Sequence, residues 1–205
     1  FGRVTIPTNL GEFPPVAPSP IPHRWLDKTC RELTRDEIHK IIESFGKGAF
    51  NAKRAGFDGV EIHAVHEGYL IDQFAIAFFN HRTDEYGGSL ENRLRFAKEI
   101  REEIAKTCGW DFPVAVRFSP KSMLKDWRKG ALPNEEFEEK GRDLEEGLQT
   151  AKLLEAYGYD ALDVDVGCYD AWWWNHPPMY MEKGPYRKYA KLVKEIVKVP
   201  VFMAG

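Results

Sequence analysis

Four short apolar segments, each preceded by a helical pattern of apolar residues, constrain the fold more than any other feature of this sequence. The segments lie at residues 59–63, 113–118, 161–167 and 199–205, and each is expected to form a strand. Strands that alternate with helices form right-handed βαβ units and a parallel sheet. The sequence therefore predicts an α/β fold.

The expected helices begin after an N-terminal segment that is rich in proline. Six prolines fall between residues 7 and 22, so residues 1–33 are expected to be mostly loop. Thr34 and Glu37 have the spacing of a capping box, and Gly56 is expected just beyond the end of that first helix. Further helices are expected over residues 90–105 and around residues 148–154 and 189–196, which gives four βα units over residues 34–205.

Two architectures accommodate parallel βα units: a doubly wound sheet and a (β/α)8 barrel. A dinucleotide-binding doubly wound sheet would carry G-x-G-x-x-G directly after its first strand, whereas this chain has His63-Ala64-Val65-His66 there. The barrel is therefore favoured. A complete barrel has eight strands and about 250 residues, so a chain with four strands that starts at Phe1 is expected to be a truncated, partial barrel.

Composition excludes several classes of function. The net charge is −3, the charges are interspersed, and no apolar stretch approaches the about 18 residues of a membrane helix, which argues against nucleic-acid and membrane partners. Cys30, Cys108 and Cys168 are far apart and form no CxxC pair, so neither a disulfide framework nor a metal site is expected. These features favour a cytoplasmic protein.

Candidate reactive residues stand where the expected strands end, which is where active sites of barrels gather. His63, His66 and Tyr69 follow the first strand, and Arg117 ends the second. Two histidines can donate hydrogen bonds to a substrate oxygen that acquires negative charge, and a phenol can deliver a proton. The competing interpretation is structural: a lone histidine at a strand end usually only packs, and Arg117 could pair with a loop carboxylate.

Two long motifs identify a family. Residues 60–74, which read VEIHAVHEGYLIDQF, and residues 80–93, which read NHRTDEYGGSLENR, resemble the fourth-strand signature of the old yellow enzyme family. Residues 163–167 and 172–180 resemble one branch of it, which holds 2-enoate reductases, bile-acid-inducible steroid enone reductases and 2,4-dienoyl-CoA reductases. The resemblance implies that the chain carries about strands 4 to 7 of a (β/α)8 TIM barrel.

The resemblance also implies an activity and roles for residues. Family members use FMN and NAD(P)H to reduce the C=C bond of an α,β-unsaturated carbonyl compound. His63 and His66 match the pair that binds the carbonyl oxygen, and Tyr69 matches the tyrosine that protonates the α-carbon. Arg117 matches the arginine beside flavin N1 and O2, and Gly205 begins the phosphate-binding loop. One departure is Glu67, an extra residue between His66 and the Gly68-Tyr69 pair.

The loop after the third strand is expected to contact substrate through Tyr169, Trp172 and His176. Its tryptophan run could be a wall over a bulky apolar substrate or could pack against the rest of the barrel, and Tyr169 or His176 could replace Tyr69 as the proton donor. Asp163 and Asp165 are expected on one face of their strand, with partners that the sequence does not identify. The Arg82-Thr83-Asp84 motif is expected to be scaffolding.

Three hypotheses remain from the sequence. The first is an FMN-dependent ene-reductase acting on a 2-enoate, an enoyl thioester or a steroid enone, as a monomer or a homo-oligomer. The branch it resembles often also carries a [4Fe-4S] cluster and an FAD domain beyond the position of Gly205. The second is an inactive half-barrel fragment that cannot bind FMN alone. The third, an aldolase-type barrel, is disfavoured because none of the four strands ends in lysine.

Overall fold

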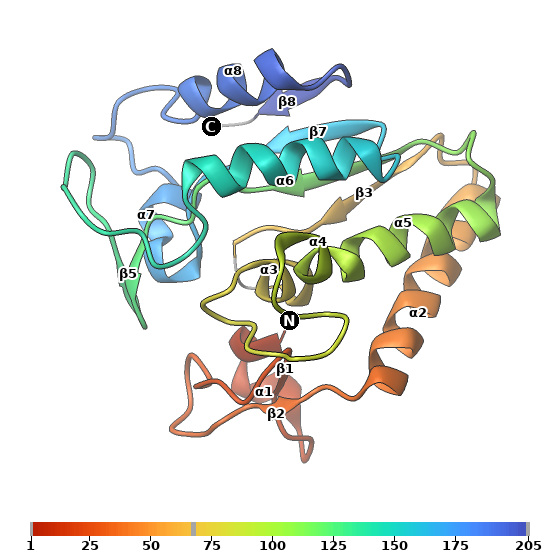
Figure 1. The fold of residues 1–205 in the computed structure, drawn as a ribbon, viewed down its shortest axis with the longest axis horizontal. Helices are drawn as coiled ribbons and strands as arrows, with labels where there is room; N and C mark the ends of the chain where they lie inside the picture. The colour runs from red at the N-terminus through yellow and green to blue at the C-terminus, as the bar shows by residue number, and fades with distance from the viewer. Residues whose placement is uncertain (1, 67–68, 204–205) are drawn as a thin grey trace.

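A parallel sheet forms the centre of the computed structural model, which describes residues 2–66 and 69–203 (Figure 1). Its strands, in spatial order, are β3 (Val60–His63), β4 (Val114–Phe118), β7 (Ala161–Val164) and β8 (Val201–Met203). All neighbouring strands of this sheet are parallel. Two small sheets accompany it, formed by β1 (Val16–Ala17) with β2 (Arg31–Glu32) and by β5 (Leu124–Asp126) with β6 (Lys129–Gly130). The predicted parallel α/β arrangement is confirmed.

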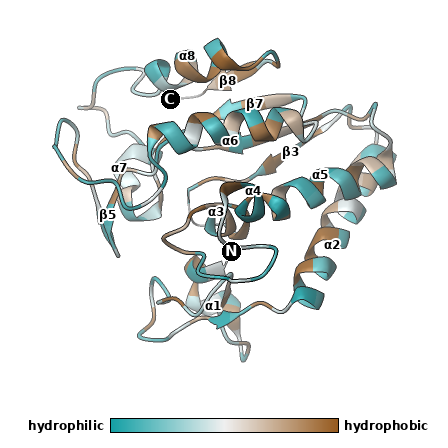
Figure 2. Ribbon diagram, in the orientation of Figure 1, coloured by the Kyte–Doolittle hydropathy of each residue, from teal (hydrophilic) through white to brown (hydrophobic). Residues whose placement is uncertain are grey.

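Helices connect the strands of the central sheet. The longer ones are α2 (Arg35–Arg54), α5 (Arg95–Cys108), α6 (Leu144–Ala156) and α8 (Arg187–Ile196). The shorter ones are η1 (Gly2–Val4), α1 (Pro7–Leu10), α3 (Leu70–Ala75), α4 (Leu90–Arg93), η2 (Tyr169–Ala171) and α7 (Trp172–Asn175). Figure 2 shows hydrophilic and hydrophobic residues interspersed along them. No helix within the described residues is both long and apolar enough to cross a membrane.

The first long helix begins and ends as the sequence predicts. The Thr34 hydroxyl accepts a hydrogen bond from the Glu37 amide at 3.2 Å, and the Glu37 carboxylate accepts one from the Thr34 amide at 2.9 Å. This reciprocal pair satisfies two amides that the first turn leaves without helical partners. Gly56, with a φ of +89°, follows the last turn of α2.

Some elements differ from the prediction. The single helix expected over residues 90–105 is two helices, α4 and α5, which meet at Leu94. The proline-rich segment contains α1, whose first residue is Pro7, because the first turn of a helix needs no amide donor there. Strand β7 stops at Val164, three residues before Gly167, which adopts a φ of +90°.

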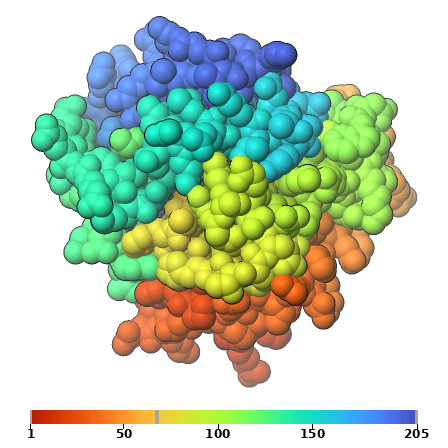
Figure 3. Space-filling view, in the orientation of Figure 1, coloured from red at the N-terminus to blue at the C-terminus, as the bar shows by residue number. Residues whose placement is uncertain are grey.

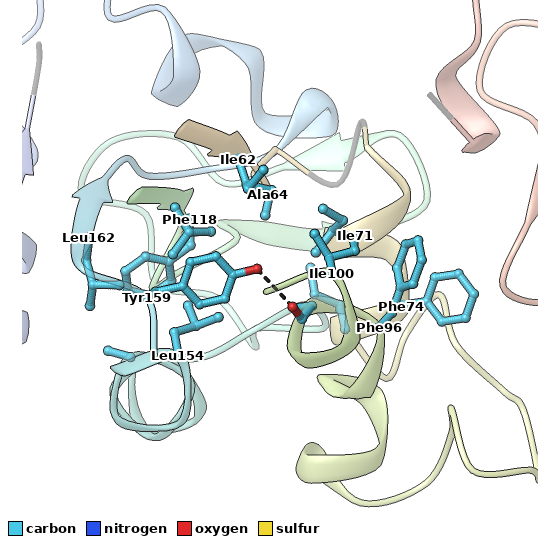
Figure 4. Packing of buried hydrophobic residues seen from close by; sticks show 14 of the residues in the cluster. Ile62, Ala64, Ile71, Phe74, Phe96, Ile100, Phe118, Leu154, Tyr159 and Leu162 are labelled. Atoms are coloured by element: carbon cyan, nitrogen blue, oxygen red, sulfur yellow. Dashed lines mark hydrogen bonds between the residues drawn. The ribbon is translucent and has the colours of Figure 1, made fainter. Parts of the chain in front are cut away.

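The two faces of the sheet are chemically different. Ile62 and Leu162 point to the buried face, where they pack with side chains from α3, α5 and α6 (Figure 4). Val116, which is in register with both, is buried in the same cluster. Within that core the Tyr159 hydroxyl donates to the carbonyl oxygen of Ala97 at 2.9 Å. The opposite face carries charged and half-exposed side chains, among them Arg117. This second face corresponds to the interior of a barrel.

The N-terminal segment and α8 lie at opposite ends of the molecule (Figure 3). The N-terminal segment packs against the part of the chain around residues 70–90, and Arg82 fixes that contact. Its guanidinium donates to the carbonyl oxygens of Pro18 at 3.0 Å and Leu33 at 2.7 Å, and it also pairs with Asp84 at 2.6 Å. These contacts agree with the expected scaffolding role of the motif at residues 82–84.

Candidate active site

Neighbouring strands place His63 and Arg117 side by side. His63, the last residue of β3, is in register with Arg117 of β4, which is in register with Asp163 of β7. Side chains in register on parallel strands point to the same face, and here that face is the one opposite the buried core. Because both positions are near the carboxyl ends of their strands, they form the floor of a candidate site.

The rings of His66 and Tyr69 both lie close to the ring of His63. The ring centroids of His63 and His66 are 5.5 Å apart, and those of His63 and Tyr69 are 4.3 Å apart. His66 has a φ of +74°, which is uncommon for a residue with a side chain, and its carbonyl oxygen accepts a hydrogen bond from the Tyr169 amide at 2.8 Å. Glu67 and Gly68 lie outside the described residues, so the effect of the extra Glu67 stays an open expectation.

Asp165 joins His66 to Arg117. Its carboxylate accepts a hydrogen bond from Nε2 of His66 at 2.8 Å and pairs with the Arg117 guanidinium. Its side chain is 1% exposed. Burial alone would raise the pKa of Asp165, but the hydrogen bond and charge of His66 and the charge of Arg117 outweigh burial and lower it. Asp165 is therefore an anion at neutral pH that orients two candidate site residues.

Arg117 makes the ion pair that the sequence left as an alternative. Its partners are Asp163 and Asp165, the two aspartates whose partners the sequence did not identify. Nε of Arg117 lies 3.5 Å from the Asp163 carboxylate, and a terminal nitrogen contacts the Asp165 carboxylate. Asp163 belongs to β7, and Asp165 is the first residue after that strand. The Arg117 side chain remains 29% exposed. Pairing with aspartates and contact with a ligand are therefore compatible.

His63 is held in its neutral form. Burial, together with the nearby positive charges of His66 and Arg117, lowers the pKa of His63 to about 4, while the charge of Asp165 opposes this shift. A neutral imidazole still carries one N–H, so it can donate a hydrogen bond to a developing oxyanion.

This pKa gives a prediction for the pH dependence of His63. Its ring is expected to titrate near pH 4, so it stays neutral from pH 6 to 8. Between the ordinary value of 6.5 and about 4 the unfolded chain binds the proton more tightly, so His63 makes folding less favourable as the pH falls through that range. Histidine NMR spectra of the protein and of its His63→Gln variant would identify the resonance. A midpoint near 6.5 would contradict the assigned environment.

An aromatic chain extends from the histidines to the loop after β7. The ring of Tyr169 lies 6.3 Å from that of His66 and 5.2 Å from that of Trp172, and the Trp172 ring stacks on His176 at 4.2 Å. Trp172 is 46% exposed. The three residues expected to contact substrate thus form a row of neighbouring rings that begins at His66.

The other two tryptophans of the run are structural. The indole N–H groups of Trp173 and Trp174 both donate to the carbonyl oxygen of Ala131, at 2.7 Å and 2.8 Å. Trp174 is buried, in contrast to Trp172. Trp172 faces outward beside Tyr169, where a wall over the substrate stays a prediction, and the next two tryptophans hold the loop to Ala131.

Asp170 fixes this loop and was not anticipated from the sequence. It is buried, pairs with the guanidinium groups of Arg3 and Arg24, and accepts a hydrogen bond from the Arg128 amide at 3.0 Å. Arg24 also lies 5.9 Å from the centroid of the Tyr169 ring. The N-terminal segment and the β5–β6 hairpin thereby position Tyr169.

Comparison with known proteins decides the family. Residues 15–205 match the model of the NADH:flavin oxidoreductase / NADH oxidase family. The chain belongs to this family. It is 64% identical over 206 residues to a cinnamate reductase of Clostridium sporogenes and 42% identical over 205 residues to an NADH oxidase of Thermoanaerobacter brockii. It covers 31% and 29% of these two proteins, so it spans about a third of the length of these curated relatives.

Solved structures confirm the predicted fold class for this family member. The old yellow enzyme homologue of Zymomonas mobilis is 30% identical, with a TM-score of 0.71, and the match covers all of this chain and 54% of that one. The chain is thus part of a (β/α)8 barrel, and the resemblance inferred from residues 60–74 and 80–93 is confirmed.

The described residues fit the FMN that the family name implies. Arg117 presents a permanent cation on the open face of the sheet, and 29% of its side chain stays exposed beside its two aspartate partners. Such a donor suits the electronegative edge of a flavin ring. Gly205, the expected start of the phosphate-binding loop, lies outside the described residues.

Proposed function

We propose that this chain is the catalytic part of an FMN-dependent ene-reductase that reduces the C=C bond of an α,β-unsaturated carbonyl compound with NAD(P)H. The observation that carries the proposal is the arrangement of His63, His66, Arg117 and Asp165 at the carboxyl ends of the strands. The family of the chain supports it. We further propose that residues 1–205 form one partial FMN-binding domain.

The roles of the residues follow from the charge that develops during the reaction. When bound, FMN supplies the hydride that adds to the β-carbon of the alkene. The carbonyl oxygen then gains negative charge, and an N–H of the His63 and His66 pair donates to it; one such donor is typically worth about 3 to 4 kcal/mol in the transition state. Tyr69, whose ring contacts His63, delivers the proton to the α-carbon.

We propose a 2-enoate with an aromatic substituent as the substrate. One relative is named a cinnamate reductase, and Tyr169 and Trp172 offer partly exposed aromatic surfaces beside His66. Planar aromatic rings stack on such surfaces with a small loss of conformational entropy. Cys30, Cys108 and Cys168 are buried and form no CxxC pair, which suits the reducing cytoplasm that we propose as the location.

The test uses the full-length protein loaded with FMN. The flavin is reduced under anaerobic conditions and mixed with cinnamate, an unsubstituted 2-enoate or a steroid enone, and its reoxidation is followed by absorbance. Fast reoxidation by cinnamate, together with formation of the saturated acid, supports the proposal. Reduced flavin that none of the three alkenes reoxidises would exclude ene-reduction.

Tyr69→Phe is expected to slow alkene reduction by about a hundredfold, because it removes the proposed proton donor and leaves the ring contact with His63 in place. Flavin content and the rate of flavin reduction by NAD(P)H should stay at wild-type levels. Rapid mixing of the reduced variant with alkene measures the loss. Unchanged turnover would move the proton donor elsewhere, and Tyr169→Phe and His176→Gln would then be compared with it.

A further inference from the structure

A basic cavity borders the loop after β7, and its lining includes Trp174 but none of His63, His66, Tyr69 and Arg117. It has a volume of about 710 Å³ and is bounded by the loop at residues 133–134 and by the segment at residues 180–191, which includes the first turn of α8. Figure 1 shows that both segments lie on the same side of the molecule, next to α7. This volume falls within the range of small-molecule binding sites.

The charge of the lining is strongly one-sided. Lys183, Arg187, Lys188 and Lys191 line the cavity, against one acidic residue, Glu182. Lys191 approaches Glu195 at 3.9 Å on its own helix. In the described part of the chain, no ion pair engages the other three basic side chains. All four basic side chains are exposed, so water and salt screen their repulsion, and their shared positive charge attracts an anion to the cavity.

Hydrogen bonds within the chain hold the back wall of the cavity in position. Trp174 forms this wall, and its indole N–H is held by the Ala131 carbonyl oxygen at 2.8 Å. The Trp174 carbonyl oxygen accepts a hydrogen bond from the hydroxyl of Tyr186, which is buried at the start of α8. A wall fixed from both sides loses little entropy when a ligand binds.

An exposed aromatic ring stands at the rim. Tyr180 lines the cavity and is 86% exposed, so its ring face is available to a planar base. Guanidinium and ammonium groups together with an aromatic ring are the groups that recognise phosphates and the base of a nucleotide.

We propose that this cavity binds the phosphate groups of an adenine nucleotide that takes part in the reaction. This proposal rests on the proposed function. The nucleotide comes from one of two sources: the NAD(P)H that reduces the enzyme, or the coenzyme A portion of an enoyl thioester substrate. Both present phosphates attached to adenosine, which is the chemistry that the basic cavity complements. The cavity adjoins α7, whose first residue, Trp172, belongs to the aromatic chain of the candidate site.

The direct test is binding of ADP to the full-length, FMN-loaded protein, measured by calorimetry. ADP contains no alkene and no hydride, so the result is independent of whether the protein is an ene-reductase. The Arg187→Gln/Lys188→Gln variant is expected to bind ADP at least about tenfold more weakly. A matched control, Lys40→Gln/Lys152→Gln, removes two exposed cations from α2 and α6 and should leave the affinity unchanged. Equal ADP affinity in all three proteins would overturn the proposal.

The source of the nucleotide is then read from KM values. If NAD(P)H occupies the cavity, the Arg187→Gln/Lys188→Gln variant raises KM for NAD(P)H and leaves KM for cinnamoyl-CoA unchanged. If the thioester occupies it, KM rises for cinnamoyl-CoA and not for free cinnamate. A variant that loses ADP affinity but keeps all of these KM values would contradict a role of the cavity in the reaction.

Discussion

Replacing His63 and His66 together with alanine is expected to lower the rate of alkene reduction by about a thousandfold or more, because the substrate oxygen then loses its two imidazole donors. The rate at which NAD(P)H reduces the flavin should change little. Rapid-mixing measurements of the two half-reactions of the full-length protein separate these effects. The physical reason is that the oxygen gains negative charge only when the alkene is reduced.

The control for this double variant is His39→Ala, which removes an exposed imidazole from α2. It should leave both half-reactions at wild-type rates. An equal loss in both half-reactions of the His63→Ala/His66→Ala variant would mean that the histidines hold the flavin site together and do not act on the substrate oxygen.

Asp165→Ala is expected to cost about 2 kcal/mol or more of stability and most of the alkene-reducing activity. The substitution leaves His66 without its acceptor and Arg117 without one of its two carboxylates. Removing one partner of a buried ion pair typically costs about 3 to 5 kcal/mol, and the smaller figure allows for the partial exposure of Arg117. Chemical unfolding followed through the release of FMN would report on this domain specifically.

Comparison with Asp165→Asn separates charge from hydrogen bonding. Asparagine keeps an acceptor for His66 but loses the negative charge. At neutral pH, Asp165→Asn should therefore lower the stability less than Asp165→Ala does. The lowered pKa of Asp165 means that its charge stabilises the fold above the ordinary aspartate pKa, and that this contribution disappears as the pH falls through the lower folded value. The difference between wild type and Asp165→Asn should therefore shrink below about pH 4. Asp27→Asn, in an exposed loop, is the matched control. If Asp165→Ala were as stable and active as this control, the proposed role of Asp165 would be wrong.

The strands and the long helices follow from local sequence. Alternating helix and strand patterns predicted the order of the βα units, and the Thr34 and Glu37 capping box located the start of α2 because a cap depends on neighbours within one turn. Short elements such as α3, α7 and the β5–β6 hairpin were not predicted. Their few residues carry too little periodicity, and tertiary packing determines their structure.

The candidate site was only partly predictable. His63, His66, Tyr69 and Arg117 stand out because they end strands or carry a family motif. The function of Asp165 depends on His66 and Arg117, which are 99 and 48 positions away in the sequence. Pairs so far apart cannot be predicted from local sequence patterns. The same holds for Asp170, whose charged partners come from the N-terminal segment. The chemical character of a single residue can be read from a sequence, whereas contacts between distant segments can be known only from the folded structure.

The most direct measurement is a crystal structure of the full-length protein with FMN and the saturated acid hydrocinnamate bound. The account predicts that the acid lies over the isoalloxazine ring, that a carboxylate oxygen accepts a hydrogen bond from His63 or His66, and that Arg117 contacts the same flavin. A structure in which the acid or the flavin binds away from the carboxyl ends of β3 and β4, touching neither the histidines nor Arg117, would contradict it.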